Sequence, residues 1–196
     1  DVSWLFNYKA VSGLLDDFFT PYPSIEASFL VNNSFYPNYG ANQNSDNKTE
    51  FAYTDKENSL EIPSLGIYAP IVFSQSTDKK VLAKDLNKGV IVYPGSVLPG
   101  EKGPTVILGH SSPLNWPKVR YDWVFNNLND LKIGDSVIIN INRKQYTYKI
   151  TQKNIIEKGQ DLASISSTAD KNVLILVSCW PPGKDYKRIV VQAELN

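Results

Sequence analysis

The chain contains one histidine, His110, and one cysteine, Cys179, and each stands where an apolar, mostly β-branched run ends. A cysteine attacks an acyl carbon as the thiolate, and a neighbouring imidazolium favours that thiolate. The same imidazole can protonate a leaving amine and later deprotonate an incoming nucleophile. Brought together, the two side chains would be suited to acyl transfer.

Arg188 adds a third group, because it opens the apolar run that follows Cys179. If residues 180–187 form a hairpin loop, Cys179 and Arg188 face each other across two paired strands. A guanidinium is always charged and carries forked donors, so it can stabilise an oxyanion. Acyl transfer by these three groups needs neither a metal nor an organic cofactor. Each residue also has a purely structural interpretation: a buried thiol, a satisfied strand-end histidine and a solvated cation.

Composition narrows the class of protein. A length of 196 residues suits one domain with a small appendage, and 20 Lys and Arg balance 20 Asp and Glu. This balance favours neither nucleic acid nor an anionic membrane as partner. One cysteine excludes an internal disulfide and a multi-cysteine metal site. The chain has no methionine and no apolar run of ~18 residues, so we expect that an N-terminal signal or anchor has been removed.

Residues 1–58 are predicted to form an appendage to the main domain. An apolar stripe from Trp4 to Phe18 predicts a helix that stops near Phe19, before the prolines of "TPYPS". The Asn-rich stretch 37–58 is predicted to be a flexible linker. The helix needs a covering surface. We expect it to brace the outer wall of the domain, or alternatively to act as a lid over Cys179.

Residues 59–196 are predicted to form a mainly β domain with short helices. A short helix is expected at 78–86 with Asp78 as its N-cap, and one or two helical turns at 124–131. The remaining periodic runs predict about eight strands in a closed barrel or a sandwich. They are two strands within 60–73, then 89–95, 105–110, 135–141, 144–157, 172–179 and 188–195.

In the same order, these segments resemble the sortases, a family of bacterial cysteine transpeptidases. The resemblance rests on "LEIPSLGIYAPIV", "GVIVYPGSVLPGEKGPTVILGH", "VFNNLNDLKIGDSVIIN" and "LILVSCWPPGKDYKRIVVQAEL". It implies an eight-stranded β-barrel with the site at one rim. It also implies that Cys179 is the nucleophile, His110 the acid and base, and Arg188 the oxyanion or substrate clamp. No cofactor is implied.

Three further residues are predicted to bind substrate: Ser178, Trp180 and Pro181. Ser178 stands where sortases commonly have Thr, and it keeps the hydroxyl. The loop "WPPGKDY" is stiffened by its prolines and would form a wall of the substrate groove. Trp180 would pack on the peptide, or alternatively cap the end of the barrel.

The resemblance implies an enzyme that cleaves a sorting signal similar to Leu-Pro-x-Thr-Gly through a thioester. An amine, either a peptidoglycan precursor or a pilin lysine, would then accept the secreted protein. Such an enzyme would act on the extracytoplasmic face of a bacterial membrane, anchored by a segment outside this chain. Papain-like enzymes place the cysteine before the histidine, whereas here His110 comes first. L,D-transpeptidases carry the two residues close together, whereas here His110 and Cys179 are widely separated. The alternative is a non-catalytic β-sandwich module for adhesion or carbohydrate binding, using Trp116, Trp123 and Trp180. The sortase subclass is not assigned.

Overall fold

The structure is a computed structural model that describes residues 52–115, 120–158, 160 and 170–196. The predicted N-terminal helix, most of the predicted linker and Trp116 lie outside these residues. The last part of the linker differs from the prediction, because Ala52–Tyr53 form a short strand, β1. Its backbone pairs with Lys144 and Gln145 of a later strand, which gives this end of the stretch a regular conformation.

The strands lie where the sequence predicts them, with boundaries shifted by a few residues. Gly66 closes the turn between the first two predicted strands, with a left-handed φ of 63°. The described elements after β1 are β2 (Ser59–Ile62), the 3-10 turn η2 (Pro63–Leu65), β3 (Ile67–Phe73), α2 (Lys79–Leu86), β4 (Val90–Val92), β5 (Gly103–Leu108), the 3-10 turn η3 (Leu128–Asp130), β6 (Ser136–Ile141), β7 (Lys144–Glu157), β8 (Asn172–Trp180) and β9 (Lys187–Leu195).

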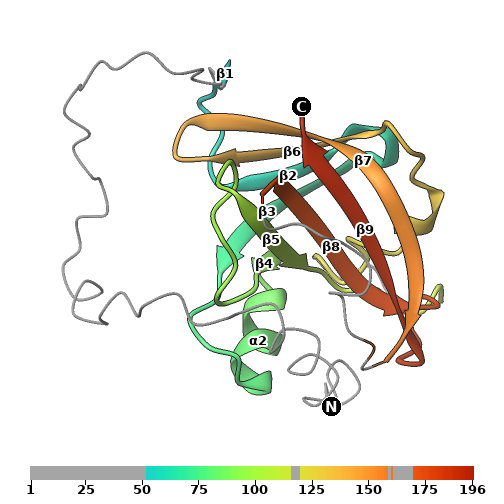
Figure 1. Ribbon diagram of the computed structural model, residues 1–196. Coiled ribbons are helices and arrows are strands. Elements are labelled where there is room, and N and C mark those ends of the chain that lie inside the picture. Colours follow the sequence, from blue (N-terminus) through green and yellow to red (C-terminus); the bar gives the residue numbers. More distant parts are fainter. Residues whose placement is uncertain (1–51, 116–119, 159, 161–169) are drawn as a thin grey trace, which may run out of the picture.

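The sheet closes on itself (Figure 1). Its strand order is β1-β7-β6-β2-β3-β4-β5-β8-β9, and β7 also pairs with β9. This last pairing joins the two ends of the order, so the strands from β2 to β9 form an eight-stranded barrel with β1 as an addition to β7. The predicted barrel is thus confirmed, and the sandwich arrangement is wrong, since a sandwich needs two separate sheets.

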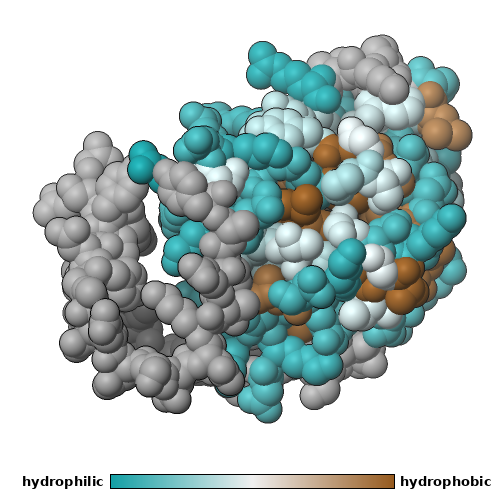
Figure 2. Space-filling view, turned by 90° about the horizontal axis from the view of Figure 1, so that it is seen from above, coloured by the Kyte–Doolittle hydropathy of each residue, from teal (hydrophilic) through white to brown (hydrophobic). Residues whose placement is uncertain are grey.

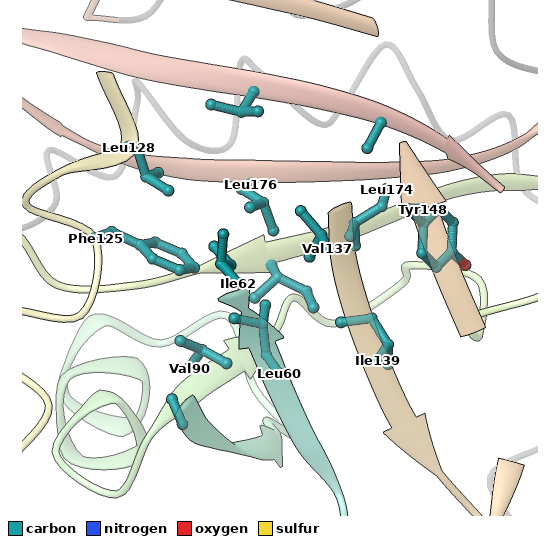
Figure 3. Packing of buried hydrophobic residues seen from close by; sticks show 14 of the residues in the cluster. Leu60, Ile62, Val90, Phe125, Leu128, Val137, Ile139, Tyr148, Leu174 and Leu176 are labelled. Carbon is teal, nitrogen blue, oxygen red and sulfur yellow. The ribbon is translucent and has the colours of Figure 1, made fainter. Parts of the chain in front are cut away.

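Alternating side chains on the strands form two apolar clusters. The interior cluster fills the barrel: Phe125 and Leu128 lie at one end of the view in Figure 3 and Tyr148 at the other. The outer cluster lies on the opposite face of β4, β5, β8 and β9, where Leu82 and Leu86 of α2 cover it. Asp78 caps α2 as predicted, because its carboxylate accepts hydrogen bonds from the amides of Lys80 and Val81. Successive residues of β8 therefore face different clusters.

Figure 2 shows the molecule from above the view of Figure 1, from the side on which the C-terminus lies. On this face, hydrophobic residues stand in separate groups among hydrophilic and intermediate ones. Exposed apolar residues in such groups are normal for a folded domain.

Candidate active site

Alternation along β8 places Cys179 on the outer face of the barrel. Val173, Ile175 and Val177 belong to the outer cluster, and Leu176 to the interior cluster. Cys179 continues the first series at the end of the strand. Only 5% of its surface is exposed, so the thiol lies in a largely water-free position.

Arg188 is the direct cross-strand partner of Cys179, as the predicted hairpin required. Arg188 lies two residues before Val190 on β9, and Val190 belongs to the outer cluster. Because side chains alternate along a strand, Arg188 faces the same side of the sheet as Val190 and Cys179. Paired residues on neighbouring antiparallel strands lie within side-chain reach of each other. Arg188 is only 2% exposed, which is rare for an arginine and requires that its charge be compensated.

His110 is carried to the same end of β8 by a parallel neighbour. Strands β5 and β8 pair in parallel, with Leu108 opposite Val177. Two more hydrogen bonds extend this alignment: the Gly109 amide donates to the Val177 carbonyl at 3.2 Å, and the Ser178 hydroxyl donates to the Gly109 carbonyl at 2.8 Å. His110 follows immediately, beside the end of β8 that carries Cys179.

The segment after His110 folds back and holds it. The amide of Phe125 donates a hydrogen bond to the His110 carbonyl at 3.0 Å, and the Ser112 amide donates to the Asp122 carbonyl at 3.0 Å. Phe125 packs so closely over Gly109 that a Cβ there would lie 2.3 Å from its ring. The "GH" pair of the sequence therefore has a steric reason: glycine lets the Phe125 ring approach the strand that presents His110.

Burial sets the protonation states of the two groups. It lowers the pKa of His110, an effect that the carboxylate of Asp122 partly opposes. It raises the pKa of Cys179 to about 11, although the positive charge of Arg188 acts in the other direction. The buried environment therefore disfavours an imidazolium–thiolate pair in the resting protein and favours a neutral imidazole beside a thiol.

Asp185 is a site residue that the sequence analysis missed. Its carboxylate forms an ion pair with Arg188 at 2.7 Å, and its other oxygen pairs with Lys158. The Sγ atom of Cys179 lies 4.0 Å from the oxygen that pairs with Arg188. The i, i+3 spacing to Arg188 was a visible signal, but an acidic residue in a surface loop is usually only solvated.

The three predicted substrate-binding residues lie in different environments. Ser178 is 4% exposed and its hydroxyl is used by Gly109, so it links β8 to β5. Trp180 is half-buried and packs against the interior cluster, as expected for a residue that caps the barrel. Pro181 is exposed at the start of the loop. Substrate binding by these residues stays a prediction.

No group of three or more His, Cys, Asp or Glu within the described ranges is placed to hold a metal ion. In the same part of the chain, every helix is too short or too polar to cross a membrane.

Comparison with known proteins identifies the family. A sequence profile described as the sortase domain matches residues 60–196. The chain belongs to the sortase family. It is 33% identical over 135 residues to the protein named sortase D of Bacillus subtilis (strain 168), a match that covers 67% of this chain and 60% of that protein. Sortases as a family are transpeptidases of the cell envelope, and this chain spans 60% of that relative's length.

Solved structures agree with the fold. Sortase C from Clostridium perfringens SM101 is 27% identical with a TM-score of 0.56, covering 74% of this chain and 72% of that one. Sortase C-1 from Actinomyces oris is 24% identical with a TM-score of 0.59, covering 71% of this chain and 72% of that one. The predicted membership and the predicted barrel are both confirmed.

We predict that Gly109→Ala displaces His110. Overpacking a well-packed position costs roughly 1–3 kcal/mol, and here the added methyl meets the Phe125 ring. Thermal denaturation and peptide cleavage measure the loss of stability and of activity. The double variant Gly109→Ala/Phe125→Leu makes room for the methyl and should regain part of both. Equal losses in the single and double variants would contradict the steric account.

We also predict the pH profile of thiol alkylation. Because the pKa of Cys179 is about 11, its reaction with iodoacetamide should accelerate with rising pH throughout the alkaline range, without levelling off near neutrality. Mass spectrometry of the single alkylated thiol gives the rate at each pH. A plateau below about pH 7 would contradict this, since it would indicate a preformed thiolate.

Proposed function

We propose that the chain is a cysteine transpeptidase that cleaves a C-terminal sorting signal similar to Leu-Pro-x-Thr-Gly and transfers the secreted protein to an amine. Cys179 acts as the nucleophile, His110 as the acid and base, and Arg188 as the clamp for the reacting carbonyl. The observation that supports this most is the backbone register, which aligns the three residues at one end of β8 in a sortase barrel.

The first half-reaction forms a thioester. As Sγ of Cys179 approaches the carbonyl carbon of the signal threonine, its proton passes to His110. The carbonyl oxygen gains negative charge, which the guanidinium of Arg188 stabilises. Collapse of this intermediate breaks the peptide bond, and His110 returns the proton to the leaving amine. In the resting state, the Cys179 thiol carries the proton that this step transfers, and the neutral imidazole of His110 is able to accept it.

The second half-reaction regenerates the thiol. An acceptor amine attacks the thioester carbon, His110 takes a proton from that amine, and the proton ends on Sγ as the carbon–sulfur bond breaks. The acceptor is a peptidoglycan precursor or a pilin lysine, and both present a primary amine. The reaction takes place on the extracytoplasmic face of the membrane, where both the secreted protein and these amines are found.

The experiment combines the protein with a signal peptide and analyses it by mass spectrometry. We expect an adduct on Cys179 with the mass of the acyl fragment, and its transfer to an added primary amine. Cys179→Ala should form no adduct and cleave no peptide, while its circular dichroism spectrum stays unchanged. Cleavage by folded Cys179→Ala would contradict the mechanism, and would leave the alternative of a non-catalytic role for the thiol.

Arg188→Lys tests the clamp. The substitution keeps the positive charge but loses the planar fork of donors, so kcat should fall by roughly 10²–10³, as for the loss of an oxyanion donor. Steady-state kinetics on the same peptide measure this. Activity near that of the parent would show that a diffuse positive charge is sufficient, and the forked hydrogen-bonding role would be wrong.

A further inference from the structure

The guanidinium of Arg188 is used on one side only. Its NH1 group forms the ion pair with the Asp185 carboxylate at 2.7 Å and donates a hydrogen bond to the Lys187 carbonyl at 2.9 Å. Its NH2 group is buried and has no hydrogen-bond partner among the described residues. A buried donor without a partner is costly, and such a group in a native structure calls for an explanation. Here the unpaired donor belongs to the residue that our proposal places at the reacting carbonyl.

Asp185 is itself fixed from two directions. Lys158, which follows β7, pairs with the carboxylate oxygen that Arg188 does not use. The loop that carries Asp185 is anchored as well, because the Gly183 amide donates to the Ser111 carbonyl at 3.0 Å. Gly183 has a left-handed φ of 73°, and a Cβ there would lie 2.4 Å from Cα of Pro113. The carboxylate is therefore positioned by neighbouring charges and by the backbone.

The Asp185–Arg188 ion pair differs from a neighbouring ion pair between β7 and β9. Glu157 of β7 and Lys187 of β9 also pair, but their side chains are 67% and 46% exposed. Exposed pairs of this kind contribute little. The Asp185–Arg188 pair is far more buried, with 16% and 3% exposed, so its charges interact with little screening by water. The exposed Glu157–Lys187 pair therefore serves as a control: removing its carboxylate tests the loss of a nearby negative charge at a position outside the Asp185–Arg188 pair.

We propose that Asp185 is a positioning residue that orients the Arg188 guanidinium, engaging NH1 so that NH2 is left to donate to the substrate carbonyl. This rests on the proposed function. The geometry favours positioning over an inhibitory latch, because a carbonyl can bind NH2 without breaking the pair at NH1. The arrangement carries an electrostatic cost, since the carboxylate lies 4.0 Å from Sγ and opposes its ionisation.

The kinetic test compares Asp185→Ala, Asp185→Asn and the control Glu157→Gln. Asp185→Ala should lower kcat by at least about tenfold with little change in KM, because the guanidinium loses its orientation. Asp185→Asn should fall in between, since it removes the charge but keeps an amide oxygen beside NH1. Asp185→Asn also provides the test of the proposal if Asp185→Ala does not fold. Glu157→Gln should match the parent. A kcat of Asp185→Ala equal to or above that of the parent would overturn the proposal, and a rise would indicate a latch.

The second readout separates positioning from a general loosening of the loop. The charged groups that act on Sγ are Arg188, Lys158 and Asp185, and His110 follows the neighbouring strand β5 at the same end of β8. Asp185→Ala removes the carboxylate and leaves the positive charges of Arg188 and Lys158 beside Sγ, which favours the thiolate. The pH profile of Cys179 alkylation should therefore move to lower pH while peptide cleavage slows. Slower cleavage with an unmoved profile would overturn the proposal. A parent that forms no acyl adduct would overturn the proposed function instead, whereas an active parent matched by Asp185→Ala would overturn only the role of Asp185.

Discussion

The register of β8 between its two neighbours is the constraint on which the candidate site depends. Its parallel pairing with β5 brings His110 to one side of the strand end, and its antiparallel pairing with β9 brings Arg188 to the other. Because side chains alternate along a strand, a slip of one residue would turn Cys179 into the barrel interior. The apolar residues of both clusters oppose such a slip, so the packing of the core also maintains the site.

The chemistry proposed for the site follows from the burial of its residues away from water. Cys179 and His110 are 5% and 4% exposed, and burial favours the neutral form of each. In the proposed mechanism, a nucleophile held as a thiol is protected from adventitious electrophiles and becomes a thiolate only as its proton is passed on. The low dielectric that favours this state would also strengthen the interaction between Arg188 and a developing oxyanion. Under this proposal, burial accounts both for the inert resting state and for the conditions of the reaction.

Much of this arrangement could be predicted from the sequence, for identifiable reasons. Alternating β-branched runs indicate the strands, and the hairpin after Cys179 predicts its pairing with Arg188, which the register confirms. Protonation states could not be predicted, because they depend on burial, which a lone His or Cys does not reveal. Asp185 was missed for a related reason: its importance arises from the burial of Arg188, and no local pattern marks a buried arginine. The short strand at Ala52–Tyr53 was missed because an isolated pair of residues has no periodicity.

The charges around Sγ leave an imbalance that suits acyl transfer. Two cations, Arg188 and Lys158, and one carboxylate, Asp185, form a connected group next to the thiol. In the resting protein this group is left with one uncompensated positive charge beside a neutral thiol. In the proposed mechanism, attack by the sulfur moves negative charge to the carbonyl oxygen, so the positive charge would be compensated in the transition state rather than before it. Interactions that strengthen only in the transition state are the ones that accelerate a reaction.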